Sequence, residues 1–445
     1  MKQEITMGSL FSGSGGFELA GSIFGIRPIW ASEIEPFPIL VTTKNFPEMK
    51  HLGDINKLNG ADLEPVTIIA GGSPCQDMSI AGKREGLDGS RSNLFREQIR
   101  IVKEMRESDR AAGRTGKQIR PRYMVWENVP GAFSSNKGKD FQAVLQEIVS
   151  ITDEESNVPL PPKGKWQTAG CIMGDHFSIA WRVLDAQYWG VPQRRKRIYL
   201  VADFRGQRAG EILLKPEGLR RNSAQSGTHG QETARCAKNS VGTAIGGVDR
   251  YNQSFLPGLA QTLRASGGGD RADTAGCNGK GVCEDKCYTL NTIDRHAVCF
   301  PQQAYNKFIQ EDIGATLKAS GGTYGGGSEN LVAKQSFSPI RYIVRRLTPT
   351  ECARLQGFPD WWGEIPKKDN LTDDEYTFWL NVRNTYAKIN NKTTKEYSKE
   401  KMLSWYNKLH SDSSEYKMWG NGIALPNALY VMQGIAEVVG VHHSK

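Results

Sequence analysis

The sequence predicts an α/β protein whose doubly wound sheet is interrupted by a second, smaller, loop-rich domain. Two observations predict the sheet: short apolar runs alternate with helical stretches between residues 5 and 130, and each run ends in a polar motif. A third observation predicts the inserted domain, because residues 204–338 hold 21 of the 48 glycines and show no sustained helical period.

Length and composition exclude several classes of protein. At 445 residues the chain is about three times the usual length of one domain, so it can bury large cores without disulfide staples. No run approaches the roughly 18 apolar residues of a membrane span, and eight cysteines are too few for a disulfide scaffold. We therefore expect a reduced, cytoplasmic protein with neither membrane segment nor leader. The net charge of +9 favours a polyanionic partner.

The strands of the sheet are expected where the apolar runs lie. They cover residues 6–11, 28–31, 66–70, 123–126 and 193–201, and a helix over 17–24 follows the first run after a glycine turn. Parallel strands joined by helices place their ligands at the carboxyl ends of the strands. The motifs that follow these runs are therefore the candidate site.

The glycine-rich segment repeats itself. The pair Thr-Leu recurs every 27 residues, at positions 262, 289 and 316. Stacked β-turn units would produce such a repeat, and a low-complexity linker with chance similarity is the alternative. We expect three parts: a core over 1–203, the inserted domain over 204–338, and a return to the core over 339–445. The last part is expected to carry a helical surface insertion at about 360–418 and a final helix from about 421.

The first candidate motif is the glycine turn FSGSGGF at residues 11–17. Its glycines let backbone N–H groups approach a ligand, and the following helix adds positive potential. The spacing suits a nucleoside with a carboxylate tail better than a dinucleotide pyrophosphate. Glu33, after the second strand, could hold ribose hydroxyls, and Asp54 could meet an adenine amino group. A plain structural turn is the alternative.

The second motif is GGSPCQ at residues 71–76. Most cysteines are inert and buried, but Cys75 follows a buried strand at its carboxyl end, and Pro74 restricts the backbone beside it. The loop over 76–93 is rich in Gly, Ser, Lys and Arg, and its length within a compact domain indicates a functional loop. We interpret Cys75 as a nucleophilic thiolate under a basic loop.

Two further motifs supply a carboxylate and two arginines. Glu127 ends the strand at 123–126 and would act as a proton donor beside the cysteine, with a helix cap or a surface charge as the alternative. Arg195 and Arg197 are two residues apart and are expected on the same face of a strand. A basic strand edge that discourages aggregation is the alternative for them.

Taken in order, these motifs resemble those of the C5-cytosine DNA methyltransferase family. The shared motifs are FSGSGGF at 11–17, SPCQ at 73–76, ENV at 127–129, Q-x-R-x-R at 193–197, RLTPTECARLQGFP at 346–359 and GNGIALP at 420–426. The glycine-rich segment lies where such enzymes carry their target recognition domain, and its TLxASGG repeats look like those of prophage-encoded members. The stretches 132–179 and 360–418 are longer than compact members need.

The resemblance implies a Rossmann-like, doubly wound mixed sheet and a covalent mechanism. The thiolate of Cys75 would add to cytosine C6 while Glu127 protonates N3, and Arg195 and Arg197 would contact the cytosine carbonyl oxygen. The target base must be flipped out of the duplex for this geometry to form. The methyl donor implied is S-adenosylmethionine. By motif position its pocket would be lined by Phe11, Gly13, Gly15, Glu33, Asp54, Pro74, Leu94 and Asn421, the last opening the final helix.

The resemblance implies double-stranded DNA as the substrate and a monomeric enzyme, and it leaves a cognate restriction endonuclease open as a functional partner. One alternative is an RNA cytosine C5-methyltransferase, since a similar core occurs in a tRNA-modifying branch. Another is a catalytically silent DNA-binding relative. Methylation of an amino group is disfavoured, because such enzymes typically place Asp or Asn before two prolines and an aromatic residue, where this chain has Pro74-Cys75-Gln76.

No metal is expected. Four cysteines of the glycine-rich segment, at positions 277, 283, 287 and 299, could suggest a zinc site together with His296. They contain no C-x-x-C pair, which zinc sites commonly use, so scattered reduced cysteines are the preferred interpretation.

Overall fold

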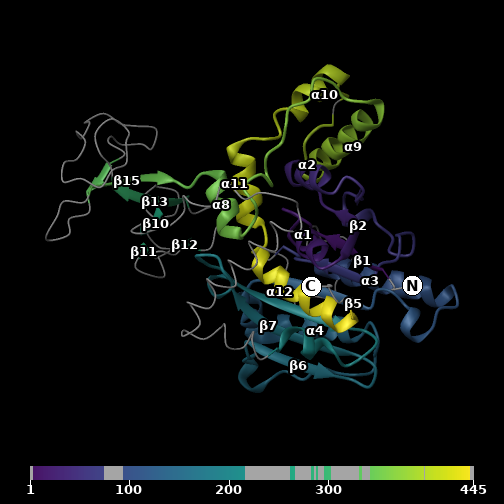
Figure 1. Ribbon diagram of the computed structural model, residues 1–445. Helices are drawn as coiled ribbons and strands as arrows, with labels where there is room; N and C mark the ends of the chain where they lie inside the picture. Colours follow the sequence, from purple (N-terminus) through teal and green to yellow (C-terminus); the bar gives the residue numbers. More distant parts are fainter. Residues whose placement is uncertain are drawn as a thin grey trace.

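A computed structural model of the protein describes residues 4–74, 94–215, 347–394 and 396–440, and the backbone of six short strands between residues 261 and 346. Its centre is an eight-stranded sheet with the strand order β3-β2-β1-β4-β5-β9-β7-β6 (Figure 1). The strands are β1 (Ile5–Leu10), β2 (Ile26–Ser32), β3 (Lys50–His51), β4 (Ile68–Gly71), β5 (Tyr123–Asn128), β6 (Ala169–Met173), β7 (Ser178–Asp185) and β9 (Lys196–Asp203).

The sheet is mixed. Strands β1 to β5 run parallel to one another, whereas β9 pairs antiparallel with β5 and β7, and β6 pairs antiparallel with β7. The order steps outward from β1 in both directions, which makes the sheet doubly wound. The predicted fold class is therefore confirmed for this core.

Helices cover both faces of the sheet, and the side chains of each strand alternate between them. Tyr123 and Val125 of β5 belong to one buried cluster, and Met124 and Trp126 belong to the other. The first cluster includes residues of α1 (Gly16–Ile23), α2 (Pro36–Asn45), α5 (Ala209–Leu213) and α12 (Leu425–Val439). The second includes residues of α3 (Leu94–Ala111) and α4 (Lys139–Val149).

The stretch at 132–179 adds α4 and the edge strand β6 to the core. Phe141 of α4 lies 6.4 Å from the Trp126 ring and 5.6 Å from the Trp181 ring, between centroids. Full burial of each large aromatic side chain contributes roughly 2 kcal/mol of hydrophobic free energy. The stretch is therefore part of the folded core, on the face opposite α1 and α12.

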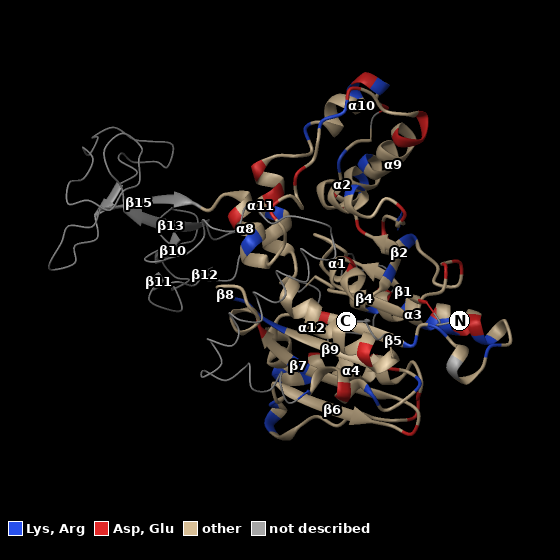
Figure 2. Cartoon of the chain, viewed as in Figure 1, with Lys and Arg blue, Asp and Glu red and all other residues tan. Residues whose placement is uncertain are grey.

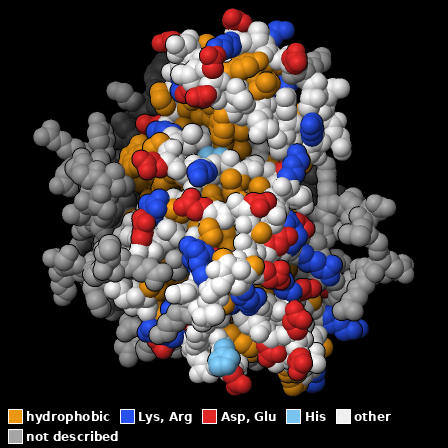
Figure 3. Space-filling model, turned by 90° about the vertical axis from the view of Figure 1, so that its right-hand side faces the viewer, with side chains coloured by type: hydrophobic (Ala, Val, Ile, Leu, Met, Phe, Trp, Pro, Cys, Tyr) orange, Lys and Arg blue, Asp and Glu red, His pale blue; other side chains and the backbone are white. Residues whose placement is uncertain are grey.

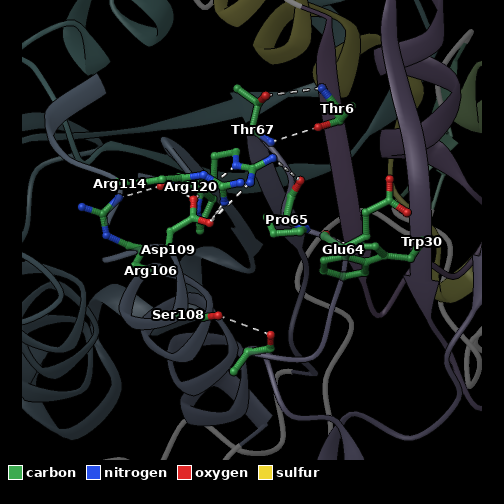
Figure 4. A network of polar contacts seen from close by, with 12 residues as sticks. Thr6, Trp30, Glu64, Pro65, Thr67, Arg106, Ser108, Asp109, Arg114 and Arg120 are labelled. Atoms are coloured by element: carbon green, nitrogen blue, oxygen red, sulfur yellow. Dashed lines mark hydrogen bonds and ion pairs between the residues drawn. The ribbon is translucent and has the colours of Figure 1, made fainter. Parts of the chain in front are cut away.

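Polar contacts fasten the amino ends of the strands, away from the candidate site (Figure 4). The Thr67 amide donates to the Thr6 hydroxyl at 3.2 Å, which joins β1 to the chain entering β4. Asp109 of α3 is almost fully buried and pairs with Arg114 and Arg120, and the Arg120 guanidinium also donates to the Pro65 carbonyl oxygen. These contacts join the chain segments at the amino ends of the strands to one another and to α3, at the end of the sheet opposite the candidate site.

The stretch at 360–418 is helical, as predicted. It contains α9 (Asp373–Ile389), α10 (Lys399–Tyr406) and most of α11 (Asp412–Asn421), after α8 (Pro349–Gln356). Figure 2 shows basic and acidic residues interspersed on α9 and α10, as on a solvated face. The inner side is apolar: Trp379 is buried in the first cluster, and His410 stacks on Phe37 of α2 with the ring centroids 5.6 Å apart.

The final helix begins later than predicted. Asn421 ends α11, and α12 starts at Leu425. Gly422 between them is extended, and Pro426 stands in the first turn of α12, where a residue without an amide hydrogen is tolerated. The prediction that Asn421 opens the final helix is therefore wrong by one short connection.

The glycine-rich segment and the strand β15 that follows it form an antiparallel five-stranded sheet in the order β11-β10-β13-β15-β14. Its strands are β10 (Gln261–Ala265), β11 (Val282–Glu284), β13 (Arg295–Pro301), β14 (Asn330–Val332) and β15 (Arg341–Arg346). A further strand, β12 (Cys287–Tyr288), pairs in parallel with β8 (Gln193–Arg194) of the core. Only the first Thr-Leu repeat falls on a described strand, so the stacked repeats and the three-part division stay predictions.

One face of the molecule carries both charged and hydrophobic areas among the described residues. Figure 3 shows charged side chains of both signs interspersed over the lower part of one face and hydrophobic side chains gathered in the upper part. No single helix among the described residues has the length and apolarity of a membrane span. Helices α11 and α12 meet both criteria only when they are taken together, and they are bent by 48° relative to each other.

Candidate active site

The glycine turn after β1 has the backbone geometry that its sequence predicts. Gly13 and Gly15 have φ angles of 53° and 78°, in the region that favours glycine, and Phe11 shares it at 57°. The Phe11 amide donates to the Ser32 carbonyl oxygen at 2.9 Å, and the Gly13 amide donates to Oε2 of Glu33 at 2.8 Å. The turn after β1 is thereby tied to the loop after β2.

Glu33 is held by three backbone amides. Its Oε1 atom accepts from Ile34 and Glu35 at 2.7 Å and 2.9 Å, in addition to the Gly13 bond to Oε2. Burial raises the pKa of this carboxyl group although the three amides oppose it. One acceptor position on Oε2 remains for a hydroxyl group of a ligand.

The loops after β2 and β3 adjoin each other. The Ser32 hydroxyl donates to the Gly53 carbonyl oxygen at 2.7 Å, so Asp54 follows directly beyond this contact. Asp54 caps a short 3-10 helix at Ile55–Lys57 by accepting from the Asn56 amide at 3.0 Å through Oδ1. Its Oδ2 atom accepts no hydrogen bond from the described residues. The structure therefore brings Gly13, Glu33 and Asp54 to the same edge of the sheet.

Glu127 and Arg197 form an ion pair at the ends of β5 and β9. Arg197 Nε lies 3.1 Å from Glu127 Oε1, and the two side chains are 14% and 15% exposed, so both are shielded yet reachable. Glu127 stands opposite Tyr199 in the strand register, and Arg197 lies two residues before Tyr199 on the same face. A carboxyl group and a guanidinium therefore meet at one edge of the sheet.

The chain that leads to Cys75 passes beside this ion pair. A Cβ atom at Gly72 would lie 2.8 Å from Glu127 Oε2, so a larger residue there would displace the Glu127 carboxylate. Asn128 Nδ2 donates to the Ser73 carbonyl oxygen, and Trp126 Nε1 donates to the Ser73 hydroxyl, both at 3.1 Å. Pro74 is exposed and is the last described residue before Cys75, which lies outside the described residues together with the loop over 76–93.

Arg195 has different partners from Arg197. It lies between β8 and β9, is 2% exposed, and donates to the carbonyl oxygens of Gly420 and Gly422 on either side of Asn421. This loop packs on the glycine turn, because a Cβ atom at Gly422 would lie 2.9 Å from the Ser14 hydroxyl oxygen. Arg195 thus links the start of β9 to the loop around Asn421. That loop in turn packs on the glycine turn that is predicted to bind the cofactor.

Comparison with known proteins decides the family. Residues 5–152 and 172–377 match the sequence model of the family described as C-5 cytosine-specific DNA methylase. The chain belongs to this family.

Individual relatives resemble this chain over different shares of their length. A DNA N-6-adenine-methyltransferase of Escherichia phage P1 is 28% identical over 98% of this chain, and the chain spans only 62% of that protein. The Type II methyltransferase M.HhaI of Haemophilus parahaemolyticus is 26% identical over 79% of this chain and 83% of its own length. Among solved structures, S. pombe Dnmt2 methyltransferase aligns with 98% of this chain and 99% of its own at 16% identity and a TM-score of 0.49.

S-adenosylmethionine is the methyl donor of this family, and the polar groups at the glycine turn of this chain fit it. Among the described residues, a Cβ atom at Gly13 would have only the Phe11 carbonyl oxygen, at 3.8 Å, as a neighbour within 4 Å, so these residues leave one side of the turn open. The hydroxyls of Ser12 and Ser14 are buried without a hydrogen bond to the described residues. Together with the remaining acceptor position on Glu33, they suit a ligand that carries hydroxyl and amino groups.

Leu94 begins α3, and its half-buried side chain packs against the second cluster. It resumes the described chain after the loop that follows Cys75. Within the parts of the chain that the structure describes, no group of three metal-ligating side chains gathers.

Three polar residues near the site have no role in the sequence prediction. Tyr199 could have been found, since it follows Arg197 by two residues and shares its face. Trp362 donates from Nε1 to the Ser14 carbonyl oxygen at 2.7 Å, so the inserted stretch touches the glycine turn, and no local signal indicates this. Glu18 is fully buried in the first turn of α1, which only the packed structure reveals.

Proposed function

We propose that the methylase transfers a methyl group to C5 of a flipped cytosine in double-stranded DNA. The observation that carries the proposal is the Glu127–Arg197 ion pair, which lies beside Gly72 and Ser73 where the chain leads into Cys75. A proton donor, a positive charge and a nucleophile at one strand edge are what addition to a cytosine ring requires.

Each side chain has one task in the proposed reaction. The guanidinium of Arg197 leaves Glu127 for the cytosine carbonyl oxygen and stabilises the charge there, with Arg195 beside it. The Cys75 thiolate adds to C6 while Glu127, having taken up a proton from solvent, delivers that proton to N3, so that electron density moves to C5. After methylation, a water molecule takes the C5 proton, the C6–S bond breaks to release the thiolate, and N3 returns its proton to Glu127. S-adenosylmethionine, when bound, supplies the electrophilic methyl group.

The cofactor pocket is proposed from the residues that the glycine turn brings together. Glu33 would accept a ribose hydroxyl, and Asp54 would meet the adenine amino group through its Oδ2 atom. The backbone of Phe11, Gly13 and Gly15 would line the donor's tail. Pro74, Leu94 and Asn421 complete the pocket by motif position, the last supported by its loop's contact with Ser14.

Cytosine C5 is favoured over adenine N6 as the target atom. The name of the phage P1 relative describes adenine methylation, but this chain spans 62% of that protein and carries Pro74-Cys75-Gln76 at the strand end. A thiol is needed to activate C5 and is not needed to methylate an amino group. We further propose that the enzyme acts as a cytoplasmic monomer and that residues 204–338 recognise the target sequence. A restriction endonuclease that cuts the same sequence stays open as a functional partner.

Product analysis tests this function directly. DNA incubated with the protein and S-adenosylmethionine should yield 5-methylcytosine and no N6-methyladenine after digestion to nucleosides and mass spectrometry. Cys75→Ser should abolish turnover while leaving cofactor affinity near normal, because an alcohol is a poor nucleophile at neutral pH. The wild-type protein should also form a stable covalent adduct with duplex DNA that carries 5-fluorocytosine. Methylation of tRNA in preference to duplex DNA would favour the RNA alternative.

A further inference from the structure

Two buried tyrosines on one face of the central sheet carry hydroxyl groups without a hydrogen-bond partner among the described residues. Tyr123 begins β5 and Tyr199 lies in β9, and both are 0% exposed. Both rings belong to the first buried cluster. An unpaired buried hydroxyl destabilises a fold, and phenylalanine would fill the same space without that penalty.

The two tyrosines differ in what lies opposite them. Tyr123 pairs with Asp203 at the amino end of β5, whereas Tyr199 pairs with Glu127 at the carboxyl end. Directly opposite residues of antiparallel strands have Cβ atoms about 5 Å apart, so the Tyr199 ring adjoins the Glu127 side chain. Burial raises the pKa of Tyr199, and the negative charge of Glu127 raises it further, while Arg197 and Arg195 oppose the rise.

The Tyr199 hydroxyl makes no hydrogen bond to the described residues. The amide group of Asn427, in the first turn of α12, is its neighbour, but no hydrogen bond of good geometry joins them. Glu127 is meanwhile held by Arg197 through Oε1. The neutral Tyr199 hydroxyl therefore lies beside the Glu127 carboxyl group, whose present hydrogen-bond donor is the charged guanidinium of Arg197.

The proposed reaction, on which this inference rests, removes that charged donor. When Arg197 turns to the cytosine carbonyl oxygen, Glu127 loses the contact to its Oε1 atom. Glu127 then takes up a proton from solvent and gives it to N3, which leaves a carboxylate that no longer has Arg197 as its donor. The Tyr199 hydroxyl already lies on the same face beside Glu127 and makes no hydrogen bond to the described residues, so it is suited to donate to this carboxylate.

We propose that Tyr199 is a positioning residue for Glu127: its O–H group donates to the carboxylate that forms as the proton passes to N3. The phenol keeps its own proton throughout, so it orients and stabilises the proton donor without taking part in the transfer.

The test compares Tyr199→Phe with the matched variant Tyr123→Phe. Both remove an unpaired buried hydroxyl from the same face of the same sheet, so both should keep or raise the melting temperature. Only Tyr199→Phe should slow the single-turnover rate of methylation at saturating DNA and cofactor, by about ten- to a hundredfold, the usual effect of one hydrogen bond to a charged group. Its KM for DNA and its affinity for S-adenosylmethionine should stay within about twofold of wild type.

A double variant separates this role from a structural one. In a Glu127→Gln background no carboxylate forms, so adding Tyr199→Phe should slow the reaction no further. Equal single-turnover rates for Tyr199→Phe and Tyr123→Phe, or full additivity in the double variant, would overturn the proposal. Failure of the proposed function looks different: the wild-type protein itself would then yield no 5-methylcytosine and no adduct with 5-fluorocytosine DNA.

Discussion

One buried carboxyl group, that of Glu18 beside the glycine turn, is expected to make the stability of the fold depend on pH. It lies in the first turn of α1, fully buried, and its carboxyl group makes no hydrogen bond of good geometry to the described residues. Burial raises its pKa to about 7, the negative charge of Glu33 adds to the rise, and the nearby Ser9 hydroxyl opposes it. Glu18 is therefore largely protonated below neutral pH in the folded protein and charged above it.

This shift predicts a loss of stability as the pH rises. The folded state holds the Glu18 proton up to a pKa of about 7, whereas the unfolded chain releases it near the ordinary value of 4.5. Between these values the folded state binds more protons, so the free energy of unfolding falls as pH increases, by roughly 3 kcal/mol in all. Urea unfolding of the wild type and of Glu18→Gln at pH 5 and pH 8 measures the difference.

The isosteric variant isolates the effect of Glu18. Glu18→Gln cannot ionise, so relative to the wild type it should gain stability between pH 5 and pH 8, while Glu48→Gln, at an exposed position, should not. An identical pH dependence in Glu18→Gln and the wild type would show that Glu18 does not titrate in this range. No sequence pattern gives this shift, because it depends on how closely α1 packs on β1.

At the scale of secondary-structure elements, the side chains that meet at the strand ends can be predicted from the sequence, whereas the contacts between distant loops cannot. Glu127 and Arg197 meet because β5 and β9 are neighbours and side chains alternate with a period of two, which a sequence pattern contains. The partners of Arg195 come from residues more than 220 positions further along the chain. Only the packing of α12 against the core places the Gly420 and Gly422 carbonyl oxygens within reach.

Arg195 is therefore predicted to support cofactor binding even without DNA. Arg195→Ala would leave two buried carbonyl oxygens without this donor and free the loop that packs on Ser14 and Gly16. The affinity for S-adenosylmethionine should fall by roughly tenfold, the equivalent of about 1.4 kcal/mol. Titration calorimetry without DNA measures this separately from any contact between Arg195 and cytosine. Lys196→Ala, at an exposed neighbour, is the matched control, and equal affinities in the two variants would contradict the prediction.

At the scale of the whole molecule, the core is continuous in space although it is interrupted in sequence. The eight-stranded sheet is complete by Asp203, and α12 returns from the far end of the chain to pack along α1. The five-stranded sheet is built from the glycine-rich segment and the strand β15 that follows it. The segment also contacts the core through β12, which pairs with Gln193 and Arg194 beside Arg195. Under the proposed function, in which residues 204–338 recognise the target sequence, sequence choice and chemistry would vary separately.

Exchange of the segment over residues 204–338 with that of a relative of known specificity should transfer the methylated sequence. Cys75, Glu127 and the glycine turn all lie outside this segment, so the chemical step should survive if the chimera keeps a strand that pairs with β8. Bisulfite sequencing of DNA methylated by the chimera reads the new site. Exchange of residues 360–418 is the matched control. That stretch packs on α2, so its exchange should leave the methylated DNA sequence unchanged. A folded, active chimera that still methylates the original sequence would place recognition in the loop over 76–93 or in the 360–418 stretch.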